Sequence, residues 1–201
     1  MSLHVGEGDI LTAVLAFVSG TNRGYTRVGV LDPRQKEINW KCEKKLIGSS
    51  SNFKEVSISI SPSKDIVVAY RLGYTQLYCH IGKLTTASAH AFDDQCIEFY
   101  SERSNADLRG FYPSITINQQ GHIMWMYQST SLWKIMLHTG IVQSSGLSGG
   151  VNWKDDGVVD HVDYGCYPAV TLADTGVFIE IHGTNFGTSL FYRIGKLELE
   201  V

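Results

Sequence analysis

Internal repetition constrains this chain more than any other feature of its sequence. Three segments of the 201 residues align with one another, namely 53–84, 111–142 and 166–197. Each carries a short alternating run, a turn, a second β-rich run, a looser turn, and an aromatic-containing run that ends at glycine. The closing glycines are Gly82, Gly140 and Gly195. A weaker copy lies at the N-terminus. There, Tyr25 precedes Tyr78 by fifty-three positions, and Gly29 precedes Gly82 by the same number. Such periodicity is the signature of a repeat architecture.

Each repeat unit is expected to contain four antiparallel strands. After each of the first three closing glycines, a short run with a bulky aromatic follows, at 38–40, 97–99 and 151–153. The last unit lacks this run, but the chain ends at 197–201 with LELEV, whose alternation is typical of a half-exposed strand. Glycines at matched turn positions, Gly121 and Gly176, are typical of tight hairpins. Pro113 and Pro168 lie at matched strand starts, where a missing N–H is tolerated.

The burial of sheet faces predicts how the units assemble. One four-stranded sheet cannot cover both of its faces, whereas radial stacking covers each face with a neighbour and leaves only short edges. We therefore predict one all-β domain over residues 1–201, a four-bladed β-propeller closed by the C-terminal strand. Its units span approximately 1–52, 53–110, 111–165 and 166–201. Two alternatives stay open: a fragment of a larger ring, or a ring completed by pairing with another copy as a homo-oligomer.

Composition and charge exclude several function classes. The formal net charge is only -3, and the basic cluster at 41–45 is interrupted by Glu43, so nucleic acid is not an expected partner. No stretch approaches the apolar length of a membrane span. The opening residues lack the basic and apolar regions of a signal peptide. We expect a soluble protein, either cytoplasmic or exported without a classical signal.

The four cysteines are scattered, with no CxxC pair and no histidine at zinc-finger spacing. They are Cys42, Cys79, Cys96 and Cys166. We expect them to be buried, reduced residues, and we expect no structural metal and no cofactor. The acidic turn at 154–157, followed by Asp160 and Asp163, offers carboxylates to calcium, but its spacing matches no dedicated calcium loop. A solvated loop is expected there.

The fourth unit resembles a known repeat pattern. Its text reads GCYPAVTL at 165–172, VFIEIH at 177–182 and SLFYRIG at 189–195. This is similar to the pattern G-x-x-P-S-V-A-L, V-V-E-V-H and L-W-Y-R-V-G in the blades of bacterial propeller lectins, several of which bind fucosylated or methylated sugars. The likeness covers most of the chain and implies a propeller with a carbohydrate ligand. The Glu180 and His182 pair occurs only in the fourth unit, so equivalent sites in every blade are not expected.

Aromatic residues recur at matched positions and are candidate ligand-binding residues. Sugars present an apolar C–H face and hydroxyls, so their sites commonly pair a flat aromatic with planar polar groups. Trp40 and Trp153, each preceded by an asparagine, fit this need, and Tyr112 and Tyr167 before the matched prolines are placed to rim the same inter-blade crevice. The alternative is that these rings pack blades together.

Glu180 and His182 are also candidate ligand-binding residues. They are two positions apart on one expected strand, so their side chains share a face. A carboxylate beside an imidazole can hold a ligand hydroxyl or perform acid-base work. The alternative is a satisfied polar contact inside a packed face.

These observations together favour a binding module over an enzyme. The sequence contains no sialidase turn motif, nucleophile elbow, P-loop or HExxH motif, and no catalytic residue is predicted. We expect a non-catalytic, lectin-like carbohydrate-binding propeller whose partner is a glycan. A protein-interaction scaffold is the alternative, and a sialidase-like hydrolase is the less favoured third reading.

Overall fold

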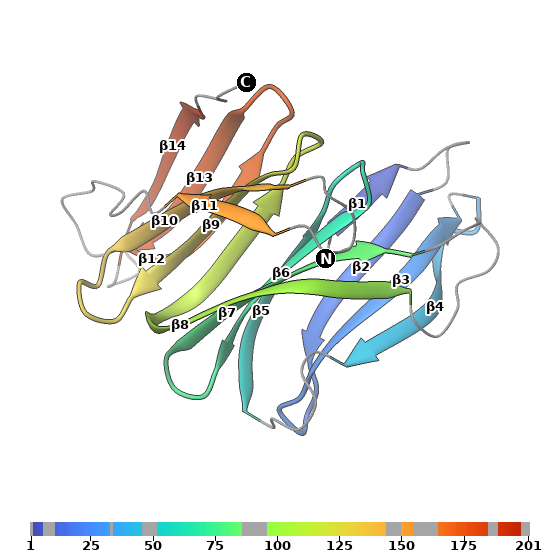
Figure 1. Ribbon diagram of the computed structural model, residues 1–201, viewed down its shortest axis with the longest axis horizontal. Helices are drawn as coiled ribbons and strands as arrows, with labels where there is room; N and C mark the ends of the chain where they lie inside the picture. The colour runs from blue at the N-terminus through green and yellow to red at the C-terminus, as the bar shows by residue number, and fades with distance from the viewer. Residues whose placement is uncertain are drawn as a thin grey trace.

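A computed structural model describes residues 2–5, 11–32, 34–45, 52–85, 96–143, 150–154, 165–184 and 189–197. Every regular element in these ranges is a β strand, so the all-β prediction is confirmed (Figure 1). The described part of the chain contains no helix long and apolar enough to cross a membrane.

The strands form three antiparallel sheets, each in simple chain order. The first contains β1 (Ser2–Val5), β2 (Leu11–Val18), β3 (Gly24–Asp32) and β4 (Glu37–Lys45). The second contains β5 (Phe53–Ile60), β6 (Asp65–Leu72), β7 (Gln76–Leu84), β8 (Ile97–Ile117), β9 (His122–Ser129), β10 (Ile135–Val142) and β11 (Val151–Lys154). The third contains β12 (Gly165–Leu172), β13 (Val177–Thr184) and β14 (Leu190–Lys196).

The long strand β8 belongs to two repeat units. Its residues 97–104 pair with β7 and its residues 110–117 pair with β9. It therefore supplies the fourth strand of the second unit and the first strand of the third, and the predicted boundary at 110/111 falls inside it. The first three units each show four strands. The fourth shows three, and residues 198–201, expected to supply another strand, lie outside the described residues.

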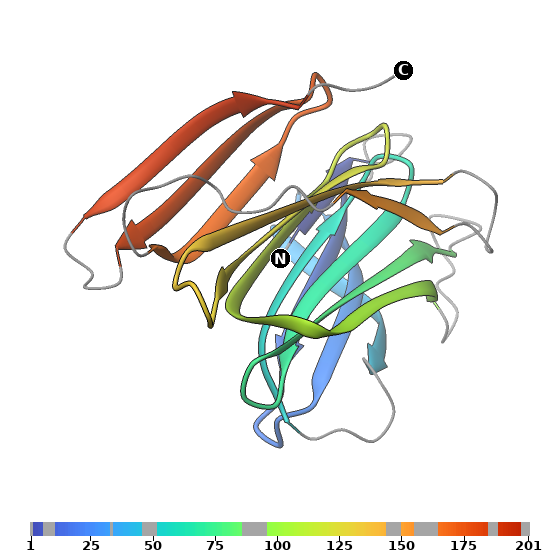
Figure 2. The ribbon, with the colours of Figure 1, turned by 60° about the vertical axis from the view of Figure 1, so that its left-hand side comes forward.

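The units stack as an open arc, not as the closed ring that we predicted. No sheet joins β14 to β1 among the described strands, and the first and fourth units lie on opposite sides of the molecule (Figures 1 and 2). The stacking between successive units is apolar. Val14 and Val28 pack on Ile66 and Val68 of the second unit. The expected packing of each unit on the next is therefore present, whereas the described strands do not join the two ends of the arc.

Side-chain hydroxyls connect the first strands of neighbouring units. The Ser57 hydroxyl accepts a hydrogen bond from the Ile115 N–H at 3.2 Å, and the Ser114 hydroxyl accepts one from the Val170 N–H at 3.1 Å. These contacts join β5 to β8 and β8 to β12. Because a backbone N–H is satisfied in each case, the serines fix the lateral spacing of the units.

Two of the four cysteines are joined, which corrects the expectation that all of them are reduced. Cys42 on β4 and Cys96, just before β8, form a disulfide with a Cα–Cα distance of 6.4 Å. Cys42 belongs to the first unit and Cys96, 54 residues later, belongs to the second, so the bond links these two units. Sequence spacing alone did not show that these strands meet. Cys79 and Cys166 are buried and free, as expected.

Candidate functional site

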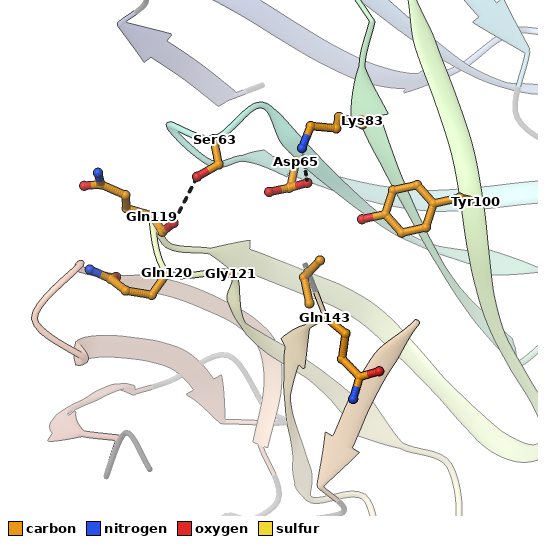
Figure 3. Close-up of a pocket in the computed structure, with 9 residues that line it drawn as sticks. Ser63, Asp65, Lys83, Tyr100, Gln119, Gln120, Gly121 and Gln143 are labelled. Carbon is orange, nitrogen blue, oxygen red and sulfur yellow. Dashed lines mark hydrogen bonds and ion pairs between the residues drawn. The ribbon is translucent and has the colours of Figure 1, made fainter. Parts of the chain in front are cut away.

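A crevice between the second and third units is a concave site that gathers charged and polar side chains. It has a volume of about 290 Å³ and lies where the β5–β6 and β8–β9 turns meet the ends of β7 and β10 (Figure 3). Its polar lining includes Ser63, Asp65, Lys83, Tyr100, Gln119, Gln120 and Gln143. None of these was a predicted site residue. The recurring turn glycine Gly121 was the one sequence signal near this place.

Three chemically different groups converge in this crevice. The Lys83 ammonium lies 3.7 Å from a carboxylate oxygen of Asp65, and the Tyr100 hydroxyl points into the same space (Figure 3). Burial raises the pKa of the Asp65 carboxyl above its ordinary value, and the charge of Lys83 opposes this rise. Burial and then the Asp65 charge raise the pKa of Tyr100 to about 12. The phenol is therefore a hydrogen-bond donor at neutral pH.

A bulge in β8 places Tyr100 in the crevice. Phe99 pairs with Gly82 and Ser101 pairs with Ile81, so Tyr100 is the extra residue between two successive pairs. A bulge of this kind redirects a side chain relative to the ordinary strand alternation. The first unit has the same irregularity at Lys41, between Trp40 and Cys42.

Hydrogen bonds fix the rim of the crevice. The Ser63 hydroxyl donates to the Gln119 carbonyl at 3.1 Å, and the Gln119 N–H donates to an Asp174 carboxylate oxygen at 2.7 Å. These bonds run from the second unit to the third and from the third to the fourth. The rim is therefore held by turns of three successive units.

A second feature, which we call the aromatic cluster, lies at the opposite ends of the same strands. It consists of Tyr74, Phe111, Tyr112, Trp133 and Tyr167. The ring of Phe111 lies 6.2 Å from that of Tyr74 and 6.3 Å from that of Trp133, measured between centroids. The cluster is open to solvent, with Tyr74 83% and Tyr167 62% exposed.

The structure brings the predicted residues Tyr112 and Tyr167 together in this cluster. Their ring centroids are 4.1 Å apart and the Tyr112 hydroxyl donates to the Tyr167 hydroxyl at 3.4 Å. Each lies at a bulge at the start of a first strand and has a positive φ, of 55° and 53° respectively. Equivalent backbone geometry in successive units therefore sets the two rings side by side, and their role in binding a ligand stays a prediction.

An ion pair contacts the aromatic cluster. Arg71 donates to both oxygens of Glu55 at 2.7 Å, and its guanidinium lies 5.1 Å from the centroid of the Phe111 ring. The Tyr112 N–H donates to Glu55 at 2.9 Å. This bidentate pair fixes the bulge of the third unit, because the same carboxylate holds both the arginine and the Tyr112 backbone.

Trp40 and Trp153 are not among the residues that line the crevice or form the aromatic cluster. Each is half-buried and lies over the closing glycine of its own sheet: a Cβ on Gly29 would be 3.0 Å from the Trp40 ring, and one on Gly140 would be 2.9 Å from the Trp153 ring. The Arg103 guanidinium also lies over the Trp153 ring, 4.6 Å from its centroid. This arrangement is consistent with the packing role that we considered as the alternative, and ligand binding by these two rings stays a prediction.

Glu180 and His182 lie on β13 inside the packing between the third and fourth units. Glu180 is 0% and His182 is 2% exposed, and Nδ1 of His182 contacts Oε1 of Glu180. The imidazole also stacks on Phe191, at 5.6 Å between centroids. A ligand in solvent does not reach these atoms in this arrangement, which favours the alternative of a polar contact inside a packed face.

The acidic loop that was considered for calcium lies largely outside the described residues, since positions 155–164 are not among them. Within the part of the chain that the structure describes, no group of three or more His, Cys, Asp or Glu side chains could hold a metal ion.

Comparison with known proteins places the fold only. No protein-family model and no curated protein sequence matches the chain. Among solved structures, a protein of unknown function from Dyadobacter fermentans matches with a TM-score of 0.56 at 12% identity, over 98% of this chain and 52% of its own. The NanB sialidase from Streptococcus pneumoniae matches with a TM-score of 0.57 at 10% identity, over 96% of this chain and 30% of its own.

An endo-arabinase from Bacteroides thetaiotaomicron matches with a TM-score of 0.54 at 11% identity, over 98% of this chain and 74% of its own. The chain thus spans about half the length of the Dyadobacter protein and less than a third of the sialidase. Identities this low carry the fold and not the activity. The chain has an all-β, propeller-like fold.

Proposed function

We propose that this chain is a non-catalytic carbohydrate-binding module that holds its ligand in the crevice between the second and third units. The observation that carries the proposal is the convergence of a carboxylate, an ammonium group and a phenol in one concave site. Asp65, Lys83 and Tyr100 supply these groups in a crevice of about 290 Å³. This volume is just below the usual range for small-ligand sites, roughly 300–1,000 Å³.

The chemistry of the crevice suits a polyol. Each sugar hydroxyl donates one hydrogen bond and accepts others, so a site needs both partners. Asp65 accepts, Lys83 donates, and the protonated Tyr100 hydroxyl does either, while the tyrosine ring beside it offers apolar surface to a C–H face. Propeller-like neighbours named as a sialidase and an endo-arabinase are consistent with a carbohydrate ligand.

The lining of the crevice supports binding without hydrolysis. Most glycoside hydrolases use two carboxyl groups on either side of the scissile bond. Among the described residues that line the crevice, Asp65 is the only carboxylate, and it is paired with Lys83. Burial raises the pKa of Asp65 and the ammonium group at 3.7 Å opposes this rise, so the crevice offers a paired carboxylate and ammonium group instead of two carboxyl groups.

A glycan array followed by calorimetry of the selected sugar tests this proposal. We expect a dissociation constant in the millimolar to micromolar range, weakened roughly fivefold by Tyr100→Phe and roughly tenfold or more by Lys83→Met. Lys41→Gln, which removes an exposed lysine from the first unit, is the matched control and should bind as the wild type does. Silence across the array, or unchanged binding in both crevice variants, would overturn the assignment.

A protein-interaction scaffold is the second candidate, and the aromatic cluster favours it. Exposed aromatic residues are enriched where proteins bind one another, and Trp133 is 44% exposed beside the more exposed Tyr74 and Tyr167. If the array is silent and a protein ligand is found, Tyr74→Ser and Tyr167→Ser should weaken that complex, whereas Tyr100→Phe should not. The two candidates therefore predict opposite sets of sensitive variants.

A further inference from the structure

One face of the fourth unit is apolar and exposed among the residues that the structure describes. Its members alternate along the last two strands, so their side chains lie on the same side of the sheet. On β13 they are Val177, Ile179 and Ile181, which are 37%, 41% and 38% exposed. On β14 they are Leu190, Tyr192 and Ile194, which are 74%, 73% and 64% exposed. We call this set the terminal face. Contiguous exposed apolar surface of this kind marks an interaction site.

The repeat shows what the terminal face is built to do, because its cross-strand pairs have equivalents in every other unit. Ile179 pairs with Ile194 across β13 and β14. The equivalent pairs are Val14 with Val28, Val67 with Ile81, and Met124 with Thr139. All six of these residues are 9% exposed or less. The valine pair of the first unit packs with residues of the second, and the pair of the second unit packs with residues of the third.

The next cross-strand pair on the same face gives the same result. Ile181 pairs with Tyr192 in the fourth unit, and its equivalents are Ala69 with Cys79 in the second unit, both 0% exposed. In the third unit the equivalent residue Met126 is 1% exposed and packs beside Val170 of the fourth. The terminal face therefore has the register and chemistry of an interface that is occupied in the three preceding units.

The first unit carries the complementary face. In the later units, the opposite side of the second strand is buried against the preceding unit, as Tyr70 and Trp125 show at 0% exposure. On the equivalent side of the first unit lie Leu15, Phe17 and Tyr25, all half-buried. The Phe17 and Tyr25 rings stack at 5.5 Å between centroids. The fourth unit thus exposes the kind of face that packs on a following unit. The first unit exposes the kind of face that packs on a preceding unit, and this face is aromatic.

We propose that the terminal face docks on the first unit of a second copy of this chain. The two faces lie on opposite sides of the arc, so one molecule in this arrangement does not join them (Figures 1 and 2). A second copy brings them together with the same stacking that already joins successive units. The contact is head-to-tail, with different surfaces on the two partners, so two copies form a ring if the rotation closes and a longer assembly if it does not.

Sedimentation velocity over a roughly hundredfold range of concentration tests this proposal, because mass action makes the association concentration-dependent. The wild type should form a dimer or a larger species as the concentration rises. Ile194→Glu places a carboxylate on the terminal face and should raise the dissociation constant roughly tenfold or more. Leu132→Glu changes an exposed leucine on the β9–β10 turn, away from both faces, and should associate as the wild type does.

A mixing experiment separates a head-to-tail contact from a symmetric one. Phe17→Glu disables the first-unit face, and Tyr25→Glu is a second variant of it in case the first fails to fold, which circular dichroism will show. The Ile194→Glu variant and the first-unit variants should each be monomeric alone, because every contact between two identical copies would need the face that the substitution has disabled. Mixed with Ile194→Glu, the Phe17→Glu protein should form a single heterodimer through the two intact faces. A wild type that stays monomeric at every concentration, or a mixture that does not associate, would refute the proposal.

Discussion

Replacement of Gly82 on β7 by alanine is expected to destabilise the protein, because the space that a methyl group needs is already filled. A Cβ at this position would lie 2.6 Å from the carbonyl oxygen of Glu98 and 2.8 Å from Cδ1 of Phe99. Both contacts are on β8, whose residue Phe99 pairs directly with Gly82. Since the oxygen belongs to the backbone, the clash is relieved only when two paired strands move apart.

The size of the effect follows from two opposing contributions. Forcing an extra carbon into a well-packed site costs typically about 1–3 kcal/mol. Alanine also restricts the unfolded chain relative to glycine, which returns about 0.4–1 kcal/mol to the folded state. The net loss in the free energy of unfolding for Gly82→Ala is therefore about 1–2 kcal/mol, which lowers the Tm of a chain of this size by roughly 2–8 °C.

Urea unfolding and thermal melts of three variants check this value. Gly140→Ala is the equivalent change in the third unit, but the three atoms nearest to a Cβ there all belong to the side chains of Val151 and Trp153, the closest at 2.8 Å and 2.9 Å. Side chains can rotate away, so its loss should be smaller. Gly20→Ala is the control, since nothing lies within 4 Å of a Cβ at that position. The reasoning fails if Gly82→Ala is as stable as the wild type or if Gly140→Ala loses more than Gly82→Ala.

Three further predictions concern the disulfide, a buried histidine and an ion pair. Changing Cys42 and Cys96 to serine should lower the free energy of unfolding by about 4 kcal/mol, which is the chain-entropy value for the 54-residue separation. The wild type should lose as much stability when reductant is added. A wild type whose stability does not change in reductant would contradict this prediction. Burial lowers the pKa of His80 below its ordinary value of 6.5. As the pH falls, this histidine is therefore protonated in the unfolded chain before it is protonated in the folded protein. The free energy of unfolding should decrease as the pH drops below about 6.5. His80→Gln should flatten this dependence in melts between about pH 5 and 8, and an unchanged slope would show that other groups cause it. Glu55→Gln weakens the bidentate bond to Arg71 and should cost about 1–2 kcal/mol in urea unfolding, an effect that Glu55→Asp, with its charge kept, should partly rescue.

The repeat allowed the order of the strands and one part of the surface to be predicted. The matched glycines Gly121 and Gly176 have φ values of 82° and 80° at the turns where they were expected. Tyr112 and Tyr167 lie together because equivalent positions in neighbouring units are neighbours in space. Any residue type that recurs once per unit is predictable in this way.

The crevice was not predictable, because its residues occupy different positions in their units. Asp65 begins β6, Lys83 ends β7, and Tyr100 is the extra residue of a bulge in β8. All three residues belong to the second unit, where Asp65 pairs directly with Lys83, but the opposite wall of the crevice comes from the third unit and forms only when the two units stack. The disulfide between Cys42 and Cys96 escaped prediction for the same reason, since the two cysteines are not equivalent in the repeat.

The sequence by itself determined the local structure: alternating runs become strands, glycines become turns, and a period of about fifty residues makes similar sheets. Tertiary structure alone decided where those sheets begin and end, since β8 runs through a predicted boundary, and whether the two ends of the arc meet. The physical reason is that strand and turn formation depend on neighbouring residues and are written into short segments. The angle between stacked sheets depends on the packing of many side chains at once, and no short segment contains it.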